Sequence, residues 1–355
     1  MNRIIAFSAV FFFSLAYAEL ILDELATSYR FEKPLHLRYL AGGTANAPAY
    51  VYTEKEGVEI PLGVFKRERE DEIFAIERFT LLEKMKENGF VYLPNVIKNG
   101  NGDYLLKIDG VPYYCLEYLP ADFHSSQNPI SFSQMVKLIG SFHAYSQKLT
   151  AEKSFHSSKI DHFKKRMRFF SDPLLLESDP LLFDTPIWKQ LISLRDYYST
   201  VEFEKIYNGL PKQIIHGDAH PENMVISNNV PYFIDFDEMR FDIRLWDLAC
   251  SILSKLFDEF LEQSKNGSLF SFLESNYEIE GVKLEDSEKK YLLTIVMFRQ
   301  VEGMAWMLEM MKSAIVNQQP ELYQQYKKYL SWGIYRMEKL IVLSNLILPP
   351  QSLPN

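Results

Sequence analysis

The fold of this chain is decided by residues 213–238, which read QIIHGDAHPENMVISNNVPYFIDFDE. Short apolar runs alternate there with polar turns, a pattern typical of short strands joined by hairpins. The first turn holds His216, Asp218 and Asn223, and Asp235 follows directly after the last apolar run. The side chains that can do chemistry therefore lie in the turns.

The spacing of these polar residues fits the transfer of a phosphoryl group. In that chemistry one carboxylate receives or orients the attacking hydroxyl, while an amide oxygen and a second carboxylate hold Mg²⁺ on the nucleotide phosphates. An Asp, an Asn five positions later and an Asp after a short hairpin supply these three groups. We therefore expect Asp218 to serve the hydroxyl, and Asn223 and Asp235 to bind Mg²⁺ on ATP.

The motif H-G-D-A-H-P-E-N, followed by I-D-F-D-E and W-D-L-A, resembles the aminoglycoside phosphotransferase and choline kinase-like family of small-molecule kinases. The resemblance implies an α+β, two-lobed protein-kinase-like fold, with a small β-rich N-lobe, a larger helical C-lobe and ATP between them. It also implies that His216 joins Asp218 in the catalytic loop as an anchor, and that Asp247 braces that loop by hydrogen bonds to its backbone. The alternative is that these are solvated loop residues of an unrelated domain.

Composition excludes several classes of protein. The chain has 355 residues, of which 47% are hydrophobic and 24% charged, as in ordinary globular proteins. Its net charge of −9 argues against nucleic acid as a partner, because nucleic acid binds basic surfaces. Cys115 and Cys250 both lie in apolar runs and are predicted to be buried thiols, not metal ligands or a disulfide. The expected partner is a small molecule that carries an acceptor hydroxyl, and the oligomeric state is left open.

Residues 1–18 resemble a secretory signal. A short positive start, an apolar run and the sequence Ala16-Tyr17-Ala18 fit the pattern, and the run is too short for a stable membrane span. The need for ATP and Mg²⁺ instead favours the cytoplasm, where both are available. We therefore expect a cytoplasmic protein. The alternatives are export after cleavage before Glu19, an uncleaved amphipathic first helix and a mis-set start codon.

Residues 19–119 are predicted to form the N-lobe. Strand-like runs over 35–43, 49–57 and 60–68 are separated by glycine-containing and charged turns. The first turn contains Gly42 and Gly43, where the resemblance places the loop that covers the nucleotide. Glycines let backbone N–H groups approach phosphates closely, although a Gly-Gly pair is also common in ordinary turns.

The resemblance assigns Lys66 to the α- and β-phosphates of ATP, with Arg67 as a rival one register away. Its expected partner is Glu77, on a helix predicted over residues 71–88, with Glu83 as a competitor. The alternative for this charge-dense stretch, which includes KRERED, is a solvated face.

The link between the lobes is predicted at the end of a strand that runs from Tyr113 to Leu119. Because the link's main chain binds the adenine edge in kinase-like folds, the resemblance places Glu117 and Leu119 there. The alternative is that Glu117 is an exposed strand residue.

Residues 120–355 are predicted to form the helical C-lobe, with helices over 131–149, 245–262, 291–311 and 322–346. In this family the helical lobe binds the acceptor. Glu302 is a candidate for contact with a cationic amine, but its spacing from Arg299 also fits an ion pair. We therefore expect transfer of the γ-phosphate of ATP to a hydroxyl of an amino alcohol, aminoglycoside or sugar-like molecule. The alternatives are a protein Ser/Thr kinase and a catalytically silent pseudokinase or binding module.

Overall fold

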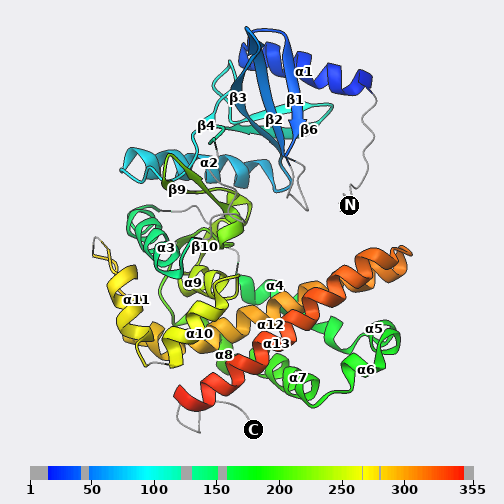
Figure 1. Ribbon diagram of the computed structural model, residues 1–355, viewed down its shortest axis with the longest axis vertical. Helices are drawn as coiled ribbons and strands as arrows, with labels where there is room; N and C mark the ends of the chain where they lie inside the picture. Colours follow the sequence, from blue (N-terminus) through cyan, green and yellow to red (C-terminus); the bar gives the residue numbers. More distant parts are fainter. Residues whose placement is uncertain are drawn as a thin grey trace. The chain divides into compact units, whose positions relative to one another are not determined.

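The computed structural model describes residues 15–40, 48–120, 130–150, 158–265, 267–279 and 281–347. The described chain divides into two compact units, one with residues 15–86 and 93–120 and the other with residues 87–92 and 130–347. The first unit contains a sheet and the second is mostly helical (Figure 1). This is the α+β class of fold that the sequence predicts.

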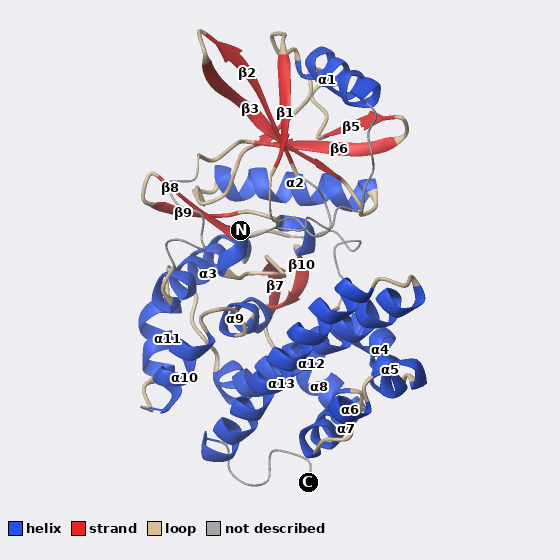
Figure 2. Cartoon of the chain, turned by 45° about the vertical axis from the view of Figure 1, so that its right-hand side comes forward, coloured by secondary structure: helices blue, strands red, loops and turns tan. Residues whose placement is uncertain are grey.

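The first unit is built on an antiparallel sheet, drawn in red in the upper part of Figure 2. Its strand order is β1-β2-β3-β6-β4, and β5 pairs with β6. The strands are β1 (Leu35–Tyr39), β2 (Ala49–Lys55), β3 (Val58–Arg67), β4 (Val96–Ile97), β5 (Leu105–Ile108) and β6 (Val111–Leu116). Strands β1 and β2 fall within their predicted runs, and β3 begins two residues before the third run, which is predicted over 60–68.

Helix α1 (Leu15–Tyr29) packs into the core of this unit. Leu25 and Tyr29 of the helix lie in one cluster with Val51 and Phe65 of the sheet. The predicted cleavage point between residues 18 and 19 therefore falls within a helix, although residues 1–14 lie outside the described part of the chain. Within the described residues no helix is both long and apolar enough to cross a membrane.

Helix α2 (Glu72–Glu87) agrees with the helix predicted over 71–88. Its neighbourhood is not simply a solvated face, because Glu68 and Arg78 are 3% and 1% exposed and form a buried ion pair. The Glu68 carboxylate also accepts hydrogen bonds from the amides of Arg69 and Glu70. These bonds fix the turn that leads from β3 into α2.

Residues 87–92, which the sequence prediction places in the N-lobe, belong to the second unit. Phe90 packs against Phe142 and Tyr145, and the amide of Phe233 donates to the carbonyl of Tyr92. Aromatic packing and a backbone hydrogen bond thus assign this short segment to the helical unit.

The second unit consists mainly of helices. Its α-helices are α3 (Phe132–Ser146), α4 (Lys159–Arg166), α5 (Pro173–Ser178), α6 (Pro180–Phe183), α7 (Pro186–Tyr198), α8 (Val201–Asn208), α9 (Leu245–Ile252), α10 (Phe257–Lys265), α11 (Leu269–Tyr277), α12 (Asp286–Val316) and α13 (Pro320–Ile347). The long helices α12 and α13 pack side by side, and α9 packs against α12. The helix predicted over 245–262 is in fact two helices, α9 and α10.

Helices α5, α6 and α7 each begin with a proline, at positions where the prolines in the sequence suggest interruptions of helices. Asp172, Asp179 and Thr185 each accept a hydrogen bond from a backbone amide in the first turn, and a proline follows each cap. Proline suits the first helical position because the amide hydrogen that it lacks has no partner within the helix there. Residues 158–208, for which the sequence analysis predicts no individual helix or strand, are therefore mostly helical.

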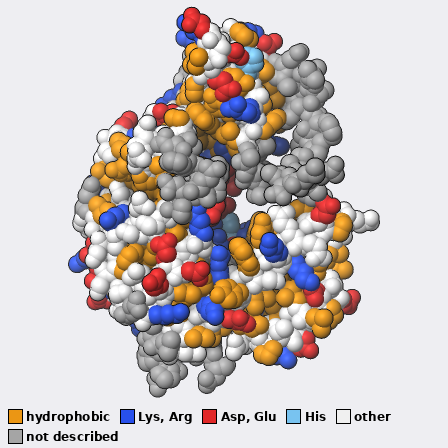
Figure 3. All heavy atoms as spheres, viewed as in Figure 1, with side chains coloured by type: hydrophobic (Ala, Val, Ile, Leu, Met, Phe, Trp, Pro, Cys, Tyr) orange, Lys and Arg blue, Asp and Glu red, His pale blue; other side chains and the backbone are white. Residues whose placement is uncertain are grey.

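Charged side chains of both signs are interspersed over the face of the helical unit drawn in Figure 3. Among the ion pairs of this unit are Lys164 with Glu204 and Lys312 with Asp172. This face therefore shows no continuous acidic patch over its described residues, although the net charge of the chain is negative.

Candidate active site

Two short antiparallel ladders in the second unit carry the motif. Strand β7 (Lys212–Ile215) pairs with β10 (Arg240–Ile243), and β8 (Met224–Ser227) pairs with β9 (Val230–Phe233). The loop over residues 216–223 connects β7 to β8, and Asp235 follows β9. The sequence predicts β7, β8 and β9, but not β10.

Asp247, at the start of α9, binds the beginning of this loop. Its Oδ2 accepts from the amide of His216 at 2.9 Å, and its Oδ1 accepts from the amide of Gly217 at 2.8 Å. The carboxylate is buried, and His143 of α3 lies 3.0 Å from Oδ2 and 2.7 Å from the hydroxyl of Tyr277. A buried carboxylate with these partners holds the loop backbone against the helices.

His216 ties the loop to the turn at Asp235. Its Nε2–H donates to the carbonyl of Ile234 at 3.0 Å, and its Nδ1 accepts from the amide of Asp218 at 3.4 Å. Burial lowers the pKa of this imidazole, which favours the neutral ring that such a pair of bonds requires. Since His216 is buried and both ring nitrogens have partners, its contacts are those of an anchor.

Asp218 is held through one carboxylate oxygen. Its Oδ2 accepts from Asn223 Nδ2 at 2.9 Å and lies 3.2 Å from His220 Nε2. Among the described residues none donates a hydrogen bond to Oδ1, and the side chain is 32% exposed. Asp218 therefore presents one oxygen on which a hydroxyl can dock.

His220 is a positively charged neighbour of Asp218. Burial opposes its protonation, but contacts with Asp218 and with Glu222, at 2.9 Å, raise the pKa of the imidazole to about 9. Burial alone would raise the pKa of the Asp218 carboxyl, yet the hydrogen bond and charge of His220 hold it well below its usual range. Arg299 and Lys159 act in the same direction. Asp218 is therefore ionised at neutral pH.

Asn223 and Asp235 are brought together by the backbone. The amide of Ile234 donates to the carbonyl of Asn223 at 3.0 Å, directly before Asp235. Since Asn223 Nδ2 is bound to Asp218, its Oδ1 is the atom that suits a cation. Asp235 itself adopts a left-handed backbone conformation with φ of 63°, which costs energy for a residue with a side chain. An amide oxygen and a carboxylate are ligands that Mg²⁺ accepts.

The described residues contain no cluster of three or more His, Cys, Asp or Glu side chains that would enclose a metal by itself. Mg²⁺ usually takes one or two protein oxygens together with substrate phosphates and water. The donor set of Asn223 and Asp235 thus fits a magnesium ion carried by a nucleotide.

In the first unit, Lys66 and Arg67 point in opposite directions, as neighbours on a strand must. Lys66 is buried on the face that α2 covers, with its ammonium 5.8 Å from the centre of the Tyr114 ring, whereas Arg67 is exposed. The competitor Glu83 is bound to Lys98 at 2.8 Å and to Tyr104 at 2.6 Å. Burial therefore favours Lys66 over Arg67.

Glu77 lies partly exposed on α2, one residue before the buried Arg78. With the Glu83 carboxylate bound elsewhere, Glu77 is the better candidate for the partner of Lys66. The nucleotide-binding roles of both residues stay predictions.

Glu117 and Leu119 follow β6. The Glu117 amide donates to the Asn95 carbonyl at 2.8 Å, and its carboxylate accepts from Asn95 Nδ2 at 2.7 Å. An adenine contact from Glu117 would therefore use its carbonyl. Gly42 and Gly43 lie outside the described residues, so their predicted phosphate contacts stay predictions.

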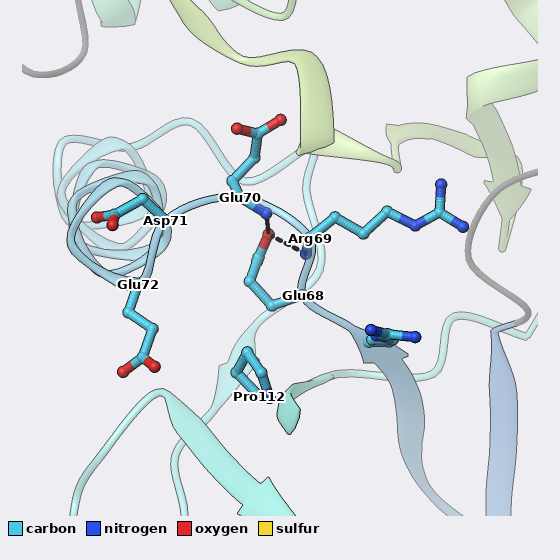
Figure 4. A pocket seen from close by; sticks show the side chains of 7 residues that line it. Glu68, Arg69, Glu70, Asp71, Glu72 and Pro112 are labelled. Atoms are coloured by element: carbon cyan, nitrogen blue, oxygen red, sulfur yellow. Dashed lines mark hydrogen bonds between the residues drawn. The ribbon is translucent and has the colours of Figure 1, made fainter. Parts of the chain in front are cut away.

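The first unit has a polar hollow of about 560 Å³ (Figure 4). It is lined by residues 67–72 and Pro112, at the turn between β3 and α2. The Glu68 carboxylate points back to the amides of its own turn and is thus occupied.

Three side chains near the catalytic loop are not predicted from the sequence. The indole of Trp246 donates to the Gly217 carbonyl at 3.0 Å, and Lys159 and Arg299 each lie 5.3 Å from the ring centre of that indole. Trp246 lies within the W-D-L-A motif, but nothing in the sequence around Lys159 or Arg299 points to the loop. Only helix packing brings them there.

Gly217→Ala is expected to destabilise the protein by about 2–4 kcal/mol. A Cβ at this position would lie 2.0 Å from the carbonyl oxygen of Glu238, and the backbone has φ of 84°. The matched control is Gly110→Ala, which has φ of 76° but nothing within 4 Å of the added carbon. Urea unfolding of both variants separates the clash from the backbone strain. Equal losses would show that no close contact constrains Gly217.

Comparison with solved structures places this fold among the kinases. A microcompartment-associated aminopropanol kinase shares 15% identity and a TM-score of 0.60, with 93% of this chain and 100% of that chain covered. An amicoumacin kinase in complex with AMP-PNP and Ca²⁺ shares 12% identity and a TM-score of 0.59, covering 88% of this chain and 93% of that one. A spectinomycin phosphotransferase in complex with ADP shares 13% identity and a TM-score of 0.58, covering 92% and 97%. At these identities the likeness establishes the protein-kinase-like fold.

No curated protein sequence matches the chain. A family model described as the phosphotransferase enzyme family matches residues 37–278, which is more than half of the chain. The match includes the catalytic loop, the Asp235 turn and Asp247, so the resemblance carried by the motifs is confirmed. The chain belongs to the phosphotransferase enzyme family.

Proposed function

We propose that this protein transfers the γ-phosphate of ATP to a hydroxyl of a small molecule. The proposal rests on the way hydrogen bonds hold the motif residues in place. Asn223 binds Asp218, and the amide of Ile234 ties Asn223 to the Asp235 turn. His216 and Asp247 hold the start of the loop. Phosphoryl transfer depends mainly on positioning and on neutralisation of charge, so a rigid set of this kind supplies what the reaction needs.

In this proposal the free Oδ1 of Asp218 accepts the hydrogen bond of the acceptor hydroxyl. The hydroxyl oxygen forms a bond to the γ-phosphorus, the bond from that phosphorus to the bridging oxygen of ADP breaks, and the hydroxyl proton passes to Asp218 and then to solvent. Asn223 and Asp235 would hold Mg²⁺, which neutralises phosphate charge. Lys66, with Glu77 as its partner, would contact the nucleotide phosphates, and the main chain of Glu117 and Leu119 the adenine.

The donor arrangement also argues against a catalytically silent binding module. A pseudokinase does not need an ionised carboxylate that has one oxygen available for a hydroxyl. Asp218 is such a carboxylate, and the amide of Asn223, whose oxygen suits a metal, lies 2.9 Å from it. We therefore place the active phosphotransferase ahead of the binding module. We favour a small-molecule acceptor over Ser or Thr side chains of proteins for two reasons. The chain matches the phosphotransferase enzyme family, and the solved structures similar to it include an aminopropanol kinase and a spectinomycin phosphotransferase.

The test is production of ADP by the purified full-length chain with Mg²⁺-ATP and a panel of acceptors. The panel contains amino alcohols, aminoglycosides, sugars, hydroxy acids and Ser/Thr peptides. ADP release that depends on one class of small molecule supports the proposal, and ³¹P NMR of the product identifies the new phosphate ester. Turnover with peptides only would assign the protein-kinase alternative, and no acceptor-dependent turnover would favour the binding module.

A further inference from the structure

Arg299 of α12 reaches the catalytic loop with its guanidinium held on three sides. Its Nε lies 3.3 Å from the Cys250 sulfur, its Nη1 lies 3.2 Å from Glu302 Oε2, and its plane lies near the Trp246 ring. These contacts leave Nη2 as the edge that is directed toward Asp218. The side chain is 24% exposed, so solvent reaches it.

Arg299 and Asp218 form an ion pair in which both groups keep hydrogen-bonding capacity. Nη2 lies 3.9 Å from Oδ1 of Asp218, within ion-pair range but too long for a hydrogen bond. Within the described part of the chain no group accepts a hydrogen bond from Nη2, and none donates one to Oδ1. An available donor of the guanidinium and an available acceptor oxygen of the carboxylate thus lie next to each other.

The carboxylates nearby that would bind an amine are already paired. Glu302, which the sequence presents as a candidate for an amine, contacts Arg299 and also Arg166, at 2.9 Å. Glu238 contacts Lys159 at 2.6 Å and also Arg240. Because each has two cationic partners, neither offers the uncompensated charge that a polyamine requires.

We propose that Arg299 binds a carboxylate of the acceptor, and that the acceptor is a small hydroxy acid. This inference rests on the proposed function, because it assigns the acceptor of that same reaction. The hydroxyl donates to Asp218 Oδ1 while a carboxylate oxygen of the same molecule accepts from Arg299 Nη2.

The test compares acceptors that differ only in charge. L-Homoserine, D-glycerate and D-gluconate are each paired with the corresponding amide or reduced alcohol, and aminopropanol, ethanolamine and kanamycin represent amines. The expected result is a kcat/KM at least about 10-fold higher for an acid than for its uncharged partner, the effect of one hydrogen bond to a charged group. Arg299→Gln should lower kcat/KM by about 10- to 100-fold for the acid, with much less effect on the uncharged partner.

Two further variants keep the test specific. In Gly303→Ala the added Cβ would lie 2.9 Å from Arg299 Nη1, so the guanidinium must shift while its charge remains. This variant should lose the preference for the acid in the same way as Arg299→Gln. Arg195→Gln, on α7, removes an arginine that pairs with Asp196 and should leave the preference unchanged. Thermal unfolding and Mg²⁺-ATP affinity are measured for all three.

The outcomes separate this inference from the function on which it rests. Turnover of amines or uncharged alcohols in preference to acids overturns the hydroxy-acid assignment and leaves the phosphotransferase intact. An equal loss in Arg299→Gln with acids and with their uncharged partners also overturns it, because the arginine would then only support the fold or Asp218. Absence of turnover with every acceptor overturns the proposed function itself.

Discussion

Asp218→Asn is expected to lower phosphate transfer by about 10²–10⁴-fold while Mg²⁺-ATP affinity stays near that of the unchanged protein. In the proposed function, the change to an amide removes the charged oxygen that would orient the acceptor hydroxyl and accept its proton. It keeps the size of the side chain, and Asn223 and Asp235 remain for the metal. Acceptor-dependent ADP release and calorimetric titration with Mg²⁺-ATP measure the two quantities separately.

The Asp218→Asn variant should stay folded with a modest loss of stability, because the folded state stabilises the ionised carboxylate through His220 and Arg299. The side chain is partly exposed, and His220 keeps Glu222 as a partner at 2.9 Å. Asp184→Asn is the matched control, because Asp184 is an exposed carboxylate in the same unit. If the Asp218 variant transfers phosphate at the rate of the unchanged protein, Asp218 is not the group that serves the hydroxyl.

Asp235→Asn is expected to weaken the binding of Mg²⁺-ATP by at least about 10- to 100-fold, the loss that even an outer partner of a metal site causes. The variant replaces an anionic ligand with a neutral one and leaves the backbone turn in place. Phosphate transfer should fall with the binding. The stabilisation of the fold by Mg²⁺-ATP, measured as a shift in Tm, should fall as well, since it follows the affinity.

Asp237→Asn provides the comparison for Asp235, because it changes another carboxylate in the same turn, η4 (Phe236–Glu238). Its Mg²⁺-ATP affinity should stay close to that of the unchanged protein. Equal titration curves for Asp235→Asn and the unchanged protein would remove Asp235 from the metal site.

The loop over residues 216–223, which is proposed to carry the catalysis, could be recognised in the sequence because its motif lies in one short stretch. Asp218, Asn223 and Asp235 lie within one stretch of the chain, and the turns between its short strands restrict their geometry whatever surrounds them. The same holds for α3, where Ser131 and Gln134 form a capping box at the predicted start. Hydrogen bonds between residues close in the chain require particular residue types at fixed spacings, so they can be recognised in the sequence.

Element boundaries were less predictable where two local signals compete. Residues 245–262 have one apolar pattern, yet the chain turns between α9 and α10. Prolines around residues 173–186 suggest interruptions, but each follows a capping side chain and starts a helix. In the first case packing against neighbouring helices decides where α9 ends, and periodicity does not report it. In the second case the cap and the proline are local signals for a helix start, which the interpretation of the prolines as interruptions missed.

The sequence alone therefore determined the family, the α+β fold and the loop residues proposed for phosphate transfer, because each rests on a local pattern. Tertiary structure alone decided that Glu302 also pairs with Arg166, and that Arg299 faces Asp218. The physical reason is that the periodicity of α12 shows which residues are apolar but not which partners its polar side chains meet. Those partners come from α4, α9 and the loop after β7, and only the packing of these elements places them together.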